Sequence, residues 1–214
     1  MTRLLTVVLA TSNEGKLAEL RSLLFDLPVE LVSLRDVVGD VVLSEDADTF
    51  EGNAEQKARH ACRATRMLSL ADDSGLEVEA LGGRPGVRTA RFAHNRATDA
   101  ENNAALLREL EDINEESRGA RFRCVLALSS PWDEEVHFAE GRCEGHIART
   151  PRGSGGFGYD PLFVVDECDG RAMAELGEDE KNAISHRARA VRALRPVLIA
   201  AVNAQLDKAE SVIG

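Results

Sequence analysis

The segment Thr11-Ser-Asn-Glu-Gly-Lys16 combines small polar residues, a glycine and a lysine between an apolar run and an amphipathic one. A strand that turns into a helix leaves free backbone N–H groups at the helix start, which attract an anion, and Lys16 adds a point charge one turn in. The segment is not a P-loop, because Leu17 stands where that motif has Ser or Thr after its lysine. An ordinary capped helix with a surface lysine explains the same residues.

An acidic set, Glu45, Asp72 and Asp73, could hold a metal ion. We expect the two aspartates to end a short strand over Leu68–Ala71 and so to lie at the edge of a sheet, where α/β proteins form their sites. Carboxylate oxygens suit Mg²⁺, which keeps several waters and bridges to substrate phosphates. The alternative is a solvated acidic turn, since the chain has 37 acidic residues from which such a group can arise by chance.

Two later segments could bind a flat, electron-rich ligand. The loop Gly153–Pro161 matches GxGxxG, but Tyr-Asp-Pro and an apolar strand follow where a dinucleotide site needs a helix. Its Phe157 could instead stack on a base, or belong to the core of a plain hairpin. His186 and Arg187 begin the last predicted helix, where the macrodipole disfavours cations, so they either meet a ligand or are simply exposed.

Alternating strands and helices, followed by hairpin-like strands, must position these residues. This order predicts an α/β fold with a mixed sheet. The length predicts one domain over residues 1–214, without a linker. The expected strands are Leu4–Leu9, Val29–Leu34, Leu68–Ala71, Arg121–Ser129, Val136–Glu144 and Leu162–Val165. The expected helices run from Ser12 or Asn13 to Leu24, from Phe50 to Met67, from a Thr98–Glu101 capping box to Ile113, and from Ser185 to Leu206 with a kink at Pro196.

Composition excludes several classes of protein. The net charge of −11 repels a phosphate backbone and argues against DNA or RNA as a partner, although a few converging cations could still bind a mononucleotide. The four cysteines lack CxxC spacing and predict reduced thiols in the cytoplasm. The apolar start, Met1–Ala10, is too short and polar for a signal peptide, and no run reaches the roughly 20 residues of a membrane helix.

Together the segments resemble the inosine triphosphate pyrophosphatases, the family that hydrolyses non-canonical purine nucleoside triphosphates. The resemblance covers residues 4–195, with one departure at Ser12, where many members carry glycine. Ser is a competent capping residue, so we expect no functional consequence. The matching strings are Ala10–Lys16, Glu45 before Thr49-Phe50, Asn53-Ala54, Lys57–Arg59, Ala71–Leu76, Gly82–Gly86, Gly155–Pro161 and Ala183–Arg187.

The resemblance implies a twisted mixed sheet flanked by helices, two lobes around a nucleotide cleft, and a homodimer. It implies Mg²⁺ held by Glu45 and Asp73, with Asp72 nearby and Asp73 as the catalytic base. The implied substrates are ITP, dITP and XTP, which are cleaved to the monophosphate and pyrophosphate. The substrate-binding residues it implies are Thr11, Ser12, Asn13, Glu14, Gly15, Lys16, Lys57 and Ser74 for the phosphates, and Phe157, Gly158, Tyr159, Asp160, Lys181, His186 and Arg187 for the base.

The chemistry of these residue types agrees with that activity. A carboxylate can take a proton from attacking water, a metal and lysines neutralise phosphate charge, and Arg187 has only donors, which pair with a keto purine but not with the amino group of adenine. How GTP is rejected, which substrate is preferred, the number of metal ions, and whether Asp72 or Asp73 is the base stay open. The alternatives are a pyrophosphatase for methylated or pyrimidine triphosphates, a nucleotide sensor without catalysis and, more remotely, a nucleic-acid-binding module.

Overall fold

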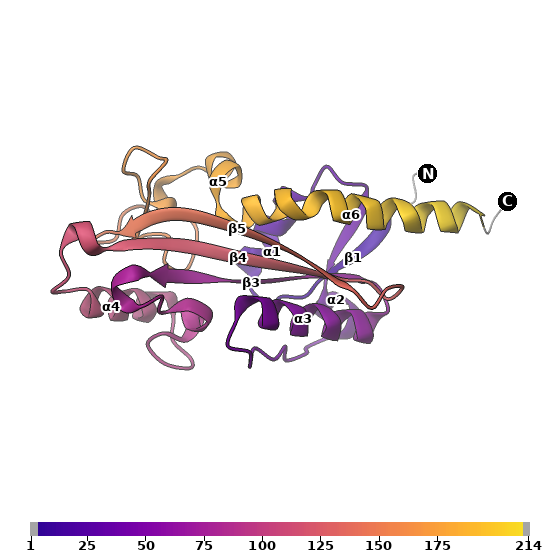
Figure 1. Ribbon diagram of the computed structural model, residues 1–214, viewed down its shortest axis with the longest axis horizontal. Coiled ribbons are helices and arrows are strands. Elements are labelled where there is room, and N and C mark those ends of the chain that lie inside the picture. The colour runs from indigo at the N-terminus through magenta and orange to yellow at the C-terminus, as the bar shows by residue number, and fades with distance from the viewer. Residues whose placement is uncertain (1–3, 212–214) are drawn as a thin grey trace. The chain divides into compact units, whose positions relative to one another are not determined.

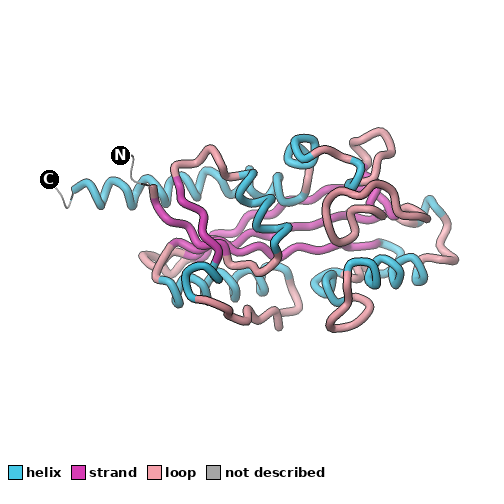
Figure 2. The backbone as a smooth tube through the Cα atoms, turned by 180° about the vertical axis from the view of Figure 1, so that it is seen from behind, coloured by secondary structure: helices cyan, strands magenta, loops and turns pink. Residues whose placement is uncertain are grey.

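The computed structural model describes residues 4–211, and Figures 1 and 2 show its helices and strands. A six-stranded sheet with the order β2-β1-β3-β4-β5-β6 confirms the predicted α/β fold. The strands are β1 (Leu5–Leu9), β2 (Val29–Ser33), β3 (Leu68–Val78), β4 (Gly119–Ser129), β5 (Val136–Ile147) and β6 (Phe163–Val165). The α-helices are α1 (Glu14–Leu23), α2 (Leu34–Val38), α3 (Phe50–Thr65), α4 (Asp99–Glu109), α5 (Glu178–Ile184) and α6 (His186–Ser211).

The chain forms two compact units, each assembled from separate stretches of sequence. Unit 1 comprises 1–73, 125–140 and 189–214, and unit 2 comprises 74–124 and 141–188. The chain passes between the units four times, first inside β3 between Asp73 and Ser74, and then within β4, β5 and α6. That the whole chain is a single domain remains a prediction.

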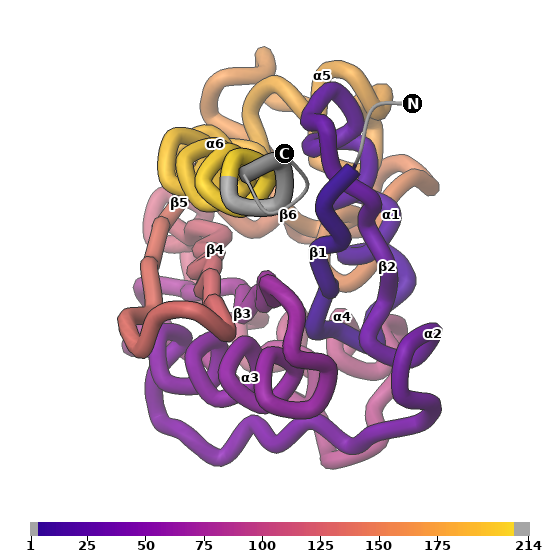
Figure 3. Tube along the Cα trace, turned by 90° about the vertical axis from the view of Figure 1, so that its right-hand side faces the viewer, coloured from indigo at the N-terminus to yellow at the C-terminus, as the bar shows by residue number. Residues whose placement is uncertain are grey.

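In unit 1, β1 lies between β2 and β3 in the sheet. It pairs in parallel with β2 and with the first residues of β3. Figure 3 shows β1 and β2 side by side. Val7, Val8 and Leu9 are completely buried, which agrees with the continuous apolar run in the sequence. Asn13 caps α1, because its side chain accepts from the backbone N–H of Lys16. The chain therefore leaves β1 and enters α1 within a few residues.

Strand β3 differs from the prediction. We expected it to end at Ala71, with the carboxylates at the edge of the sheet, but it continues through Asp72 and Asp73 to Val78. Both aspartates are buried, with exposures of 0% and 5%. Their charge suggested a turn, yet lysines from other elements neutralise them inside the unit, so the strand can continue through buried carboxylates.

Unit 2 has its own apolar core. It contains Leu76, Leu106, Phe122 and Phe163, all buried or nearly so. Strand β5 pairs antiparallel with β6, so the sheet is mixed, as predicted. The Thr98–Glu101 capping box at the start of α4 is present with both of its hydrogen bonds, although α4 ends at Glu109 and not near Ile113.

The C-terminal helices also differ from expectation. Lys181 lies on a separate short helix, α5, which was not among the expected helices. The backbone of Ser185 is extended (φ −61°, ψ 155°), which breaks the helix, and its hydroxyl accepts from the N–H of Ala188 to begin α6. Pro196 lies inside α6 and does not end it, and the kink at this residue stays a prediction.

Two expectations about the whole chain can also be compared with the structure. All four cysteines are free, and all four are buried. Among residues 4–211, no helix has the length and apolar character needed to cross a membrane.

Candidate functional site

The first polar cluster of unit 1 joins the start of α1 to the middle of β3. Lys16 Nζ lies 2.5 Å from Oδ1 of the completely buried Asp72. The loop before the helix is ordered by two local contacts, Asn13 N–H to Thr11 Oγ1 (3.2 Å) and Lys16 N–H to Asn13 Oδ1 (3.0 Å). Thr11 to Lys16 are exposed or partly exposed, so the cap holds an accessible cation beside a buried acid.

The second cluster places Lys57 of α3 between two carboxylates. Its Nζ is 2.7 Å from Oε1 of Glu45 and 2.7 Å from Oδ1 of Asp73. Asn53, one turn earlier on α3, donates to the other oxygen of Asp73 (3.2 Å) and accepts from the N–H of Ala47 (2.9 Å). Helix α3 thus holds Asp73 through both of its oxygens and fastens the loop that carries Glu45.

Burial and neighbouring charges act in opposite directions on the pKa values of Asp73 and Lys57. Burial raises the pKa of Asp73, while the nearby ammonium groups of Lys57 and Lys16 oppose the rise. Burial alone would lower the pKa of Lys57, but Asp73 and Glu45 outweigh it, and the pKa of the lysine is raised. Lys57 therefore stays cationic, and Asp73 has more affinity for a proton than a carboxyl in water.

The donor set fits a divalent cation. Oxygens of Glu45 and Asp73 already surround one positive charge, the ammonium of Lys57. Carboxylate oxygens are the ligands that Mg²⁺ takes, and Glu45, with 37% of its side chain exposed, is accessible to an entering ion. The sequence reasoning gave Asn53 no role, although its spacing of four residues from Lys57 puts both on one face of α3.

Unit 2 holds a separate group around Phe157. Lys181 Nζ lies 5.0 Å and Arg187 Cζ 5.9 Å from the centre of the Phe157 ring, both as cation–π contacts. Lys181 also donates to Asp160 Oδ2 (2.7 Å), which accepts from the N–H of Phe157 as well (3.1 Å). The glycine-rich loop and the two C-terminal helices therefore meet at this aromatic ring.

Arg187 and His186 are buried in unit 2, and neither is a surface residue. Arg187 is 1% exposed and donates to Ser74 Oγ (2.9 Å). The His186 ring stacks on Phe122, with 4.8 Å between ring centres. Tyr159 is buried too, and its hydroxyl donates to the carbonyl of Thr89 (2.9 Å). The exposed-surface alternative for His186 and Arg187 is therefore wrong.

The predicted residues thus form two groups, one in each unit, linked by the consecutive residues Asp73 and Ser74. The first contains Lys16, Glu45, Lys57, Asp72 and Asp73, and the second contains Ser74, Phe157, Asp160, Lys181 and Arg187.

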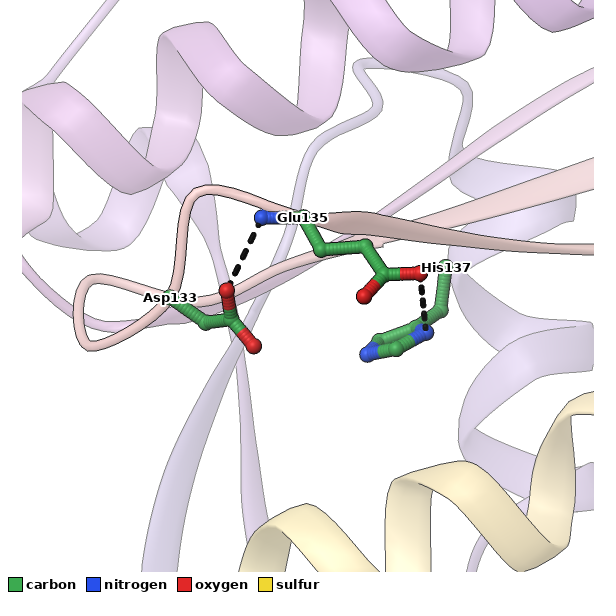
Figure 4. Close-up of side chains that lie close together, drawn as sticks. All are labelled: Asp133, Glu135 and His137. Atoms are coloured by element: carbon green, nitrogen blue, oxygen red, sulfur yellow. Dashed lines mark hydrogen bonds and ion pairs between the residues drawn. The ribbon is translucent and has the colours of Figure 1, made fainter.

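A third group of possible metal ligands lies at the turn between β4 and β5. Ligand atoms of Asp133, Glu135 and His137 lie within 4.8 Å of one another (Figure 4). The two acids are exposed and the histidine is partly exposed. The backbone of Glu135 donates to Asp133, so the turn itself explains part of the clustering. The sequence reasoning did not single out this group.

Comparison with known proteins identifies the family. The model of the Ham1 family matches residues 7–197. A protein of Geobacter sulfurreducens named dITP/XTP pyrophosphatase is 50% identical over 195 residues, which are 91% of this chain and 96% of that protein. A Bacillus subtilis protein of the same name is 46% identical over 191 residues, covering 89% of this chain and 96% of its own length.

Solved structures agree with the sequence matches. A HAM1 protein from Coxiella burnetii has a TM-score of 0.81 at 45% identity, with 91% of this chain and 98% of that chain covered. The Ham1 protein of Staphylococcus aureus has a TM-score of 0.80 at 36% identity, with 90% and 97% covered. Because the family model spans most of the sequence and the relatives match over nearly their full lengths, the chain belongs to the Ham1 family.

Proposed function

We propose that this chain hydrolyses ITP, dITP and XTP to the nucleoside monophosphate and pyrophosphate. The observation that carries the proposal is the cluster of two lysines and three carboxylates centred on Asp72 and Asp73. It supplies the cations that a triphosphate requires and an acid able to take a proton. The names of the relatives, dITP/XTP pyrophosphatase, support dITP and XTP as substrates and pyrophosphate as a product.

Asp73 is the proposed catalytic base. Its carboxylate takes a proton from water as the water oxygen bonds to the α-phosphorus, and the bond from that phosphorus to the bridging oxygen breaks. Pyrophosphate leaves with the electron pair. The raised pKa of Asp73 suits this role, because a general base is most effective when its pKa lies near the pH of the reaction. Asn53 orients the carboxylate by donating to its second oxygen.

Lys16 and the cap of α1 are the proposed phosphate site. The residues Thr11 to Gly15 present backbone N–H groups at the helix start, and Lys16 adds its ammonium. Lys57 and Ser74 are the further proposed phosphate contacts, and in this structure they are bonded to Asp73 and Arg187 respectively. Bound Mg²⁺, held by Glu45 and Asp73, would supply charge neutralisation on the phosphate oxygens.

The group around Phe157 is the proposed base site. Phe157 offers an aromatic face for stacking, Lys181 and Arg187 contact its ring, and Asp160 bonds to Lys181. The further proposed contacts of the base are Gly158, Tyr159 and His186. Arg187 has only donors, so it favours the keto oxygen of hypoxanthine and xanthine over the amino group of adenine. A homodimer, a cytoplasmic location and the absence of nucleic acid as a partner complete the proposal, and each stays a prediction.

A panel of nucleotides tests the proposal. Pyrophosphate release is measured for ITP, dITP, XTP, GTP, ATP, a pyrimidine triphosphate and a methylated purine triphosphate, with and without Mg²⁺. We expect the first three to react fastest and only with the metal. Fast release from the pyrimidine or methylated substrate would favour the alternative pyrophosphatase, and binding without turnover would favour a sensor.

A further inference from the structure

Hydrogen bonds hold the backbone on both sides of Phe157, and one of them comes from outside the proposed base site. The peptide group before Phe157 donates its N–H to Asp160 Oδ2 (3.1 Å). The peptide group after it donates the N–H of Gly158 to Asp99 Oδ2 (2.7 Å). Because the peptide planes on both sides of Phe157 are held, the direction of its Cα–Cβ bond is fixed as well.

Two side chains of helix α4 form hydrogen bonds with the backbone of Gly158. Asp99 accepts from its N–H, and Asn103, one helical turn later on the same face, donates to its carbonyl (3.0 Å). Gly158 has a φ of +62°, and the two hydrogen bonds hold it in this left-handed conformation. The capping box of Thr98 and Glu101 fixes the first turn of α4, from which Asp99 projects.

Stability alone is a poor explanation for Asn103. Its Oδ1 is buried, and among the described residues it has no hydrogen-bond partner. A buried acceptor left unpaired costs free energy that an apolar side chain of similar size would not cost. The hydrogen bond that Asn103 does form is the one from its amide nitrogen to the carbonyl of Gly158.

We infer that Asp99 and Asn103 are positioning residues for base recognition: they hold the Phe157–Asp160 loop in the conformation that receives the purine. The inference rests on the proposed function of that loop. Neither residue touches the base, and both act through Gly158. The phosphate cluster of unit 1 contains no residue of α4, so the effect is confined to the base half of the substrate.

Two partial ligands separate this role from general damage to the fold. Inosine carries the base without phosphates, and inorganic tripolyphosphate carries phosphates without a base. Both are used as inhibitors of ITP hydrolysis, and the binding of inosine is also measured directly by calorimetry. The variants are Asn103→Leu, Asp99→Ala and Asp99→Asn, with Arg108→Ala, an exposed residue of the same helix, as the control.

We expect Asn103→Leu and Asp99→Ala to raise the KM for ITP and the dissociation constant of inosine about tenfold, which corresponds to one lost hydrogen bond. The kcat and the inhibition constant of tripolyphosphate should stay within about twofold, since the hydrogen bonds of Asp99 and Asn103 lead to the Phe157 loop and not to the residues of the phosphate cluster. Asp99→Asn keeps an oxygen acceptor for Gly158 and should restore most of the affinity. Arg108→Ala should match the wild type.

Equal weakening of inosine and tripolyphosphate, or wild-type affinity for inosine in both variants, would overturn the inference. Should Asn103→Leu fail to fold, the pair Asp99→Ala and Asp99→Asn decides, because Asp99 is exposed at the helix start. Failure of the proposed function looks different: the wild type then releases no pyrophosphate from ITP before any variant is compared.

Discussion

Lys57 Nζ lies 2.7 Å from Oδ1 of Asp73 and at the same distance from Oε1 of Glu45, so one buried ammonium group bridges two carboxylates and offsets one of their two negative charges. Without a metal, this lysine provides the positive charge that the two acids need in a buried environment. The same contact holds Asp73 in place on β3, where Asn53 orients its other oxygen. The proposed catalytic base is therefore positioned before any substrate binds.

Replacing Asp73 with Asn should remove this base while preserving the shape of the side chain. We expect kcat for ITP to fall by about 10²–10⁴-fold, the usual contribution of general base catalysis. Steady-state pyrophosphate release measures the loss, and circular dichroism checks the fold. Asp133→Asn, at the exposed turn between β4 and β5, serves as the control and should keep full activity. Activity within tenfold of wild type in Asp73→Asn would remove Asp73 from the role of base.

Replacing Lys57 with Met should destabilise the metal-free protein, because it removes the cation that contacts both Asp73 and Glu45. Loss of one partner from a buried ion pair costs about 3 kcal/mol of the free energy of unfolding. Added Mg²⁺ should restore more stability to the variant than it adds to the wild type, as denaturant titrations with and without metal will show.

The matched control for that experiment is Arg59→Met on the same helix. Arg59 forms a half-exposed pair with Glu55, and such pairs contribute only about 0–1 kcal/mol. A Lys57→Met protein as stable as the wild type in metal-free buffer would show that the two carboxylates do not need the ammonium group.

Arg187 should decide between keto and amino purines. Its guanidinium is 1% exposed and bonded to Ser74, so it is held rigidly among the residues of the proposed base site. Arg187→Met removes the donors, and we expect the ratio of kcat/KM for ITP over ATP to fall by at least about tenfold, since one unpaired buried donor is worth roughly 1–3 kcal/mol. Competition between ITP and ATP measures the ratio directly. An unchanged ratio would place the selection of the base elsewhere.

Tyr159 predicts a specific response to alkaline pH. Burial raises the pKa of its hydroxyl, Asp99 raises it further, and the bond to Thr89 opposes the rise. In the unfolded chain a tyrosine loses its proton near pH 10, so above about that pH the unfolded state binds fewer protons than the folded one. The free energy of unfolding must then fall as the pH rises towards the folded pKa.

The chain has one tyrosine, so the ultraviolet absorbance of tyrosinate reports on Tyr159 alone. We expect no titration of the folded protein near pH 10 and a flatter alkaline stability profile in Tyr159→Phe. Titration at the ordinary tyrosine pKa in the folded state would contradict the buried, hydrogen-bonded hydroxyl.

Most of the elements could be predicted from the sequence because their signals are local. The apolar run of β1, the cap at Asn13 and the Thr98–Glu101 box each depend on a few neighbouring residues. The length of β3 could not be predicted, because two aspartates inside a buried strand are tolerable only beside lysines that are distant in sequence. The start of the last helix near Ser185 was predicted, but the separate helix α5 was missed, because its seven residues are too few to show an apolar period.

The candidate site was predictable to a similar extent. Residue types and family strings pointed to Lys16, Asp73 and Arg187, which carry charges that chemistry requires. Asn53, Asp99 and Asn103 were given no role, because their contribution depends on which backbone and carboxylate groups they reach in three dimensions. A polar residue that acts by holding a neighbour in place cannot be recognised from its type and spacing in one sequence.

The account as a whole rests on attack at the α-phosphorus of a keto-purine triphosphate. The most direct test is hydrolysis of ITP with Mg²⁺ in water labelled with heavy oxygen, followed by phosphorus NMR and mass spectrometry of the products. We predict IMP and pyrophosphate, with the label in the phosphate of IMP. Label in pyrophosphate, or products consisting of IDP and orthophosphate, would contradict the proposed attack.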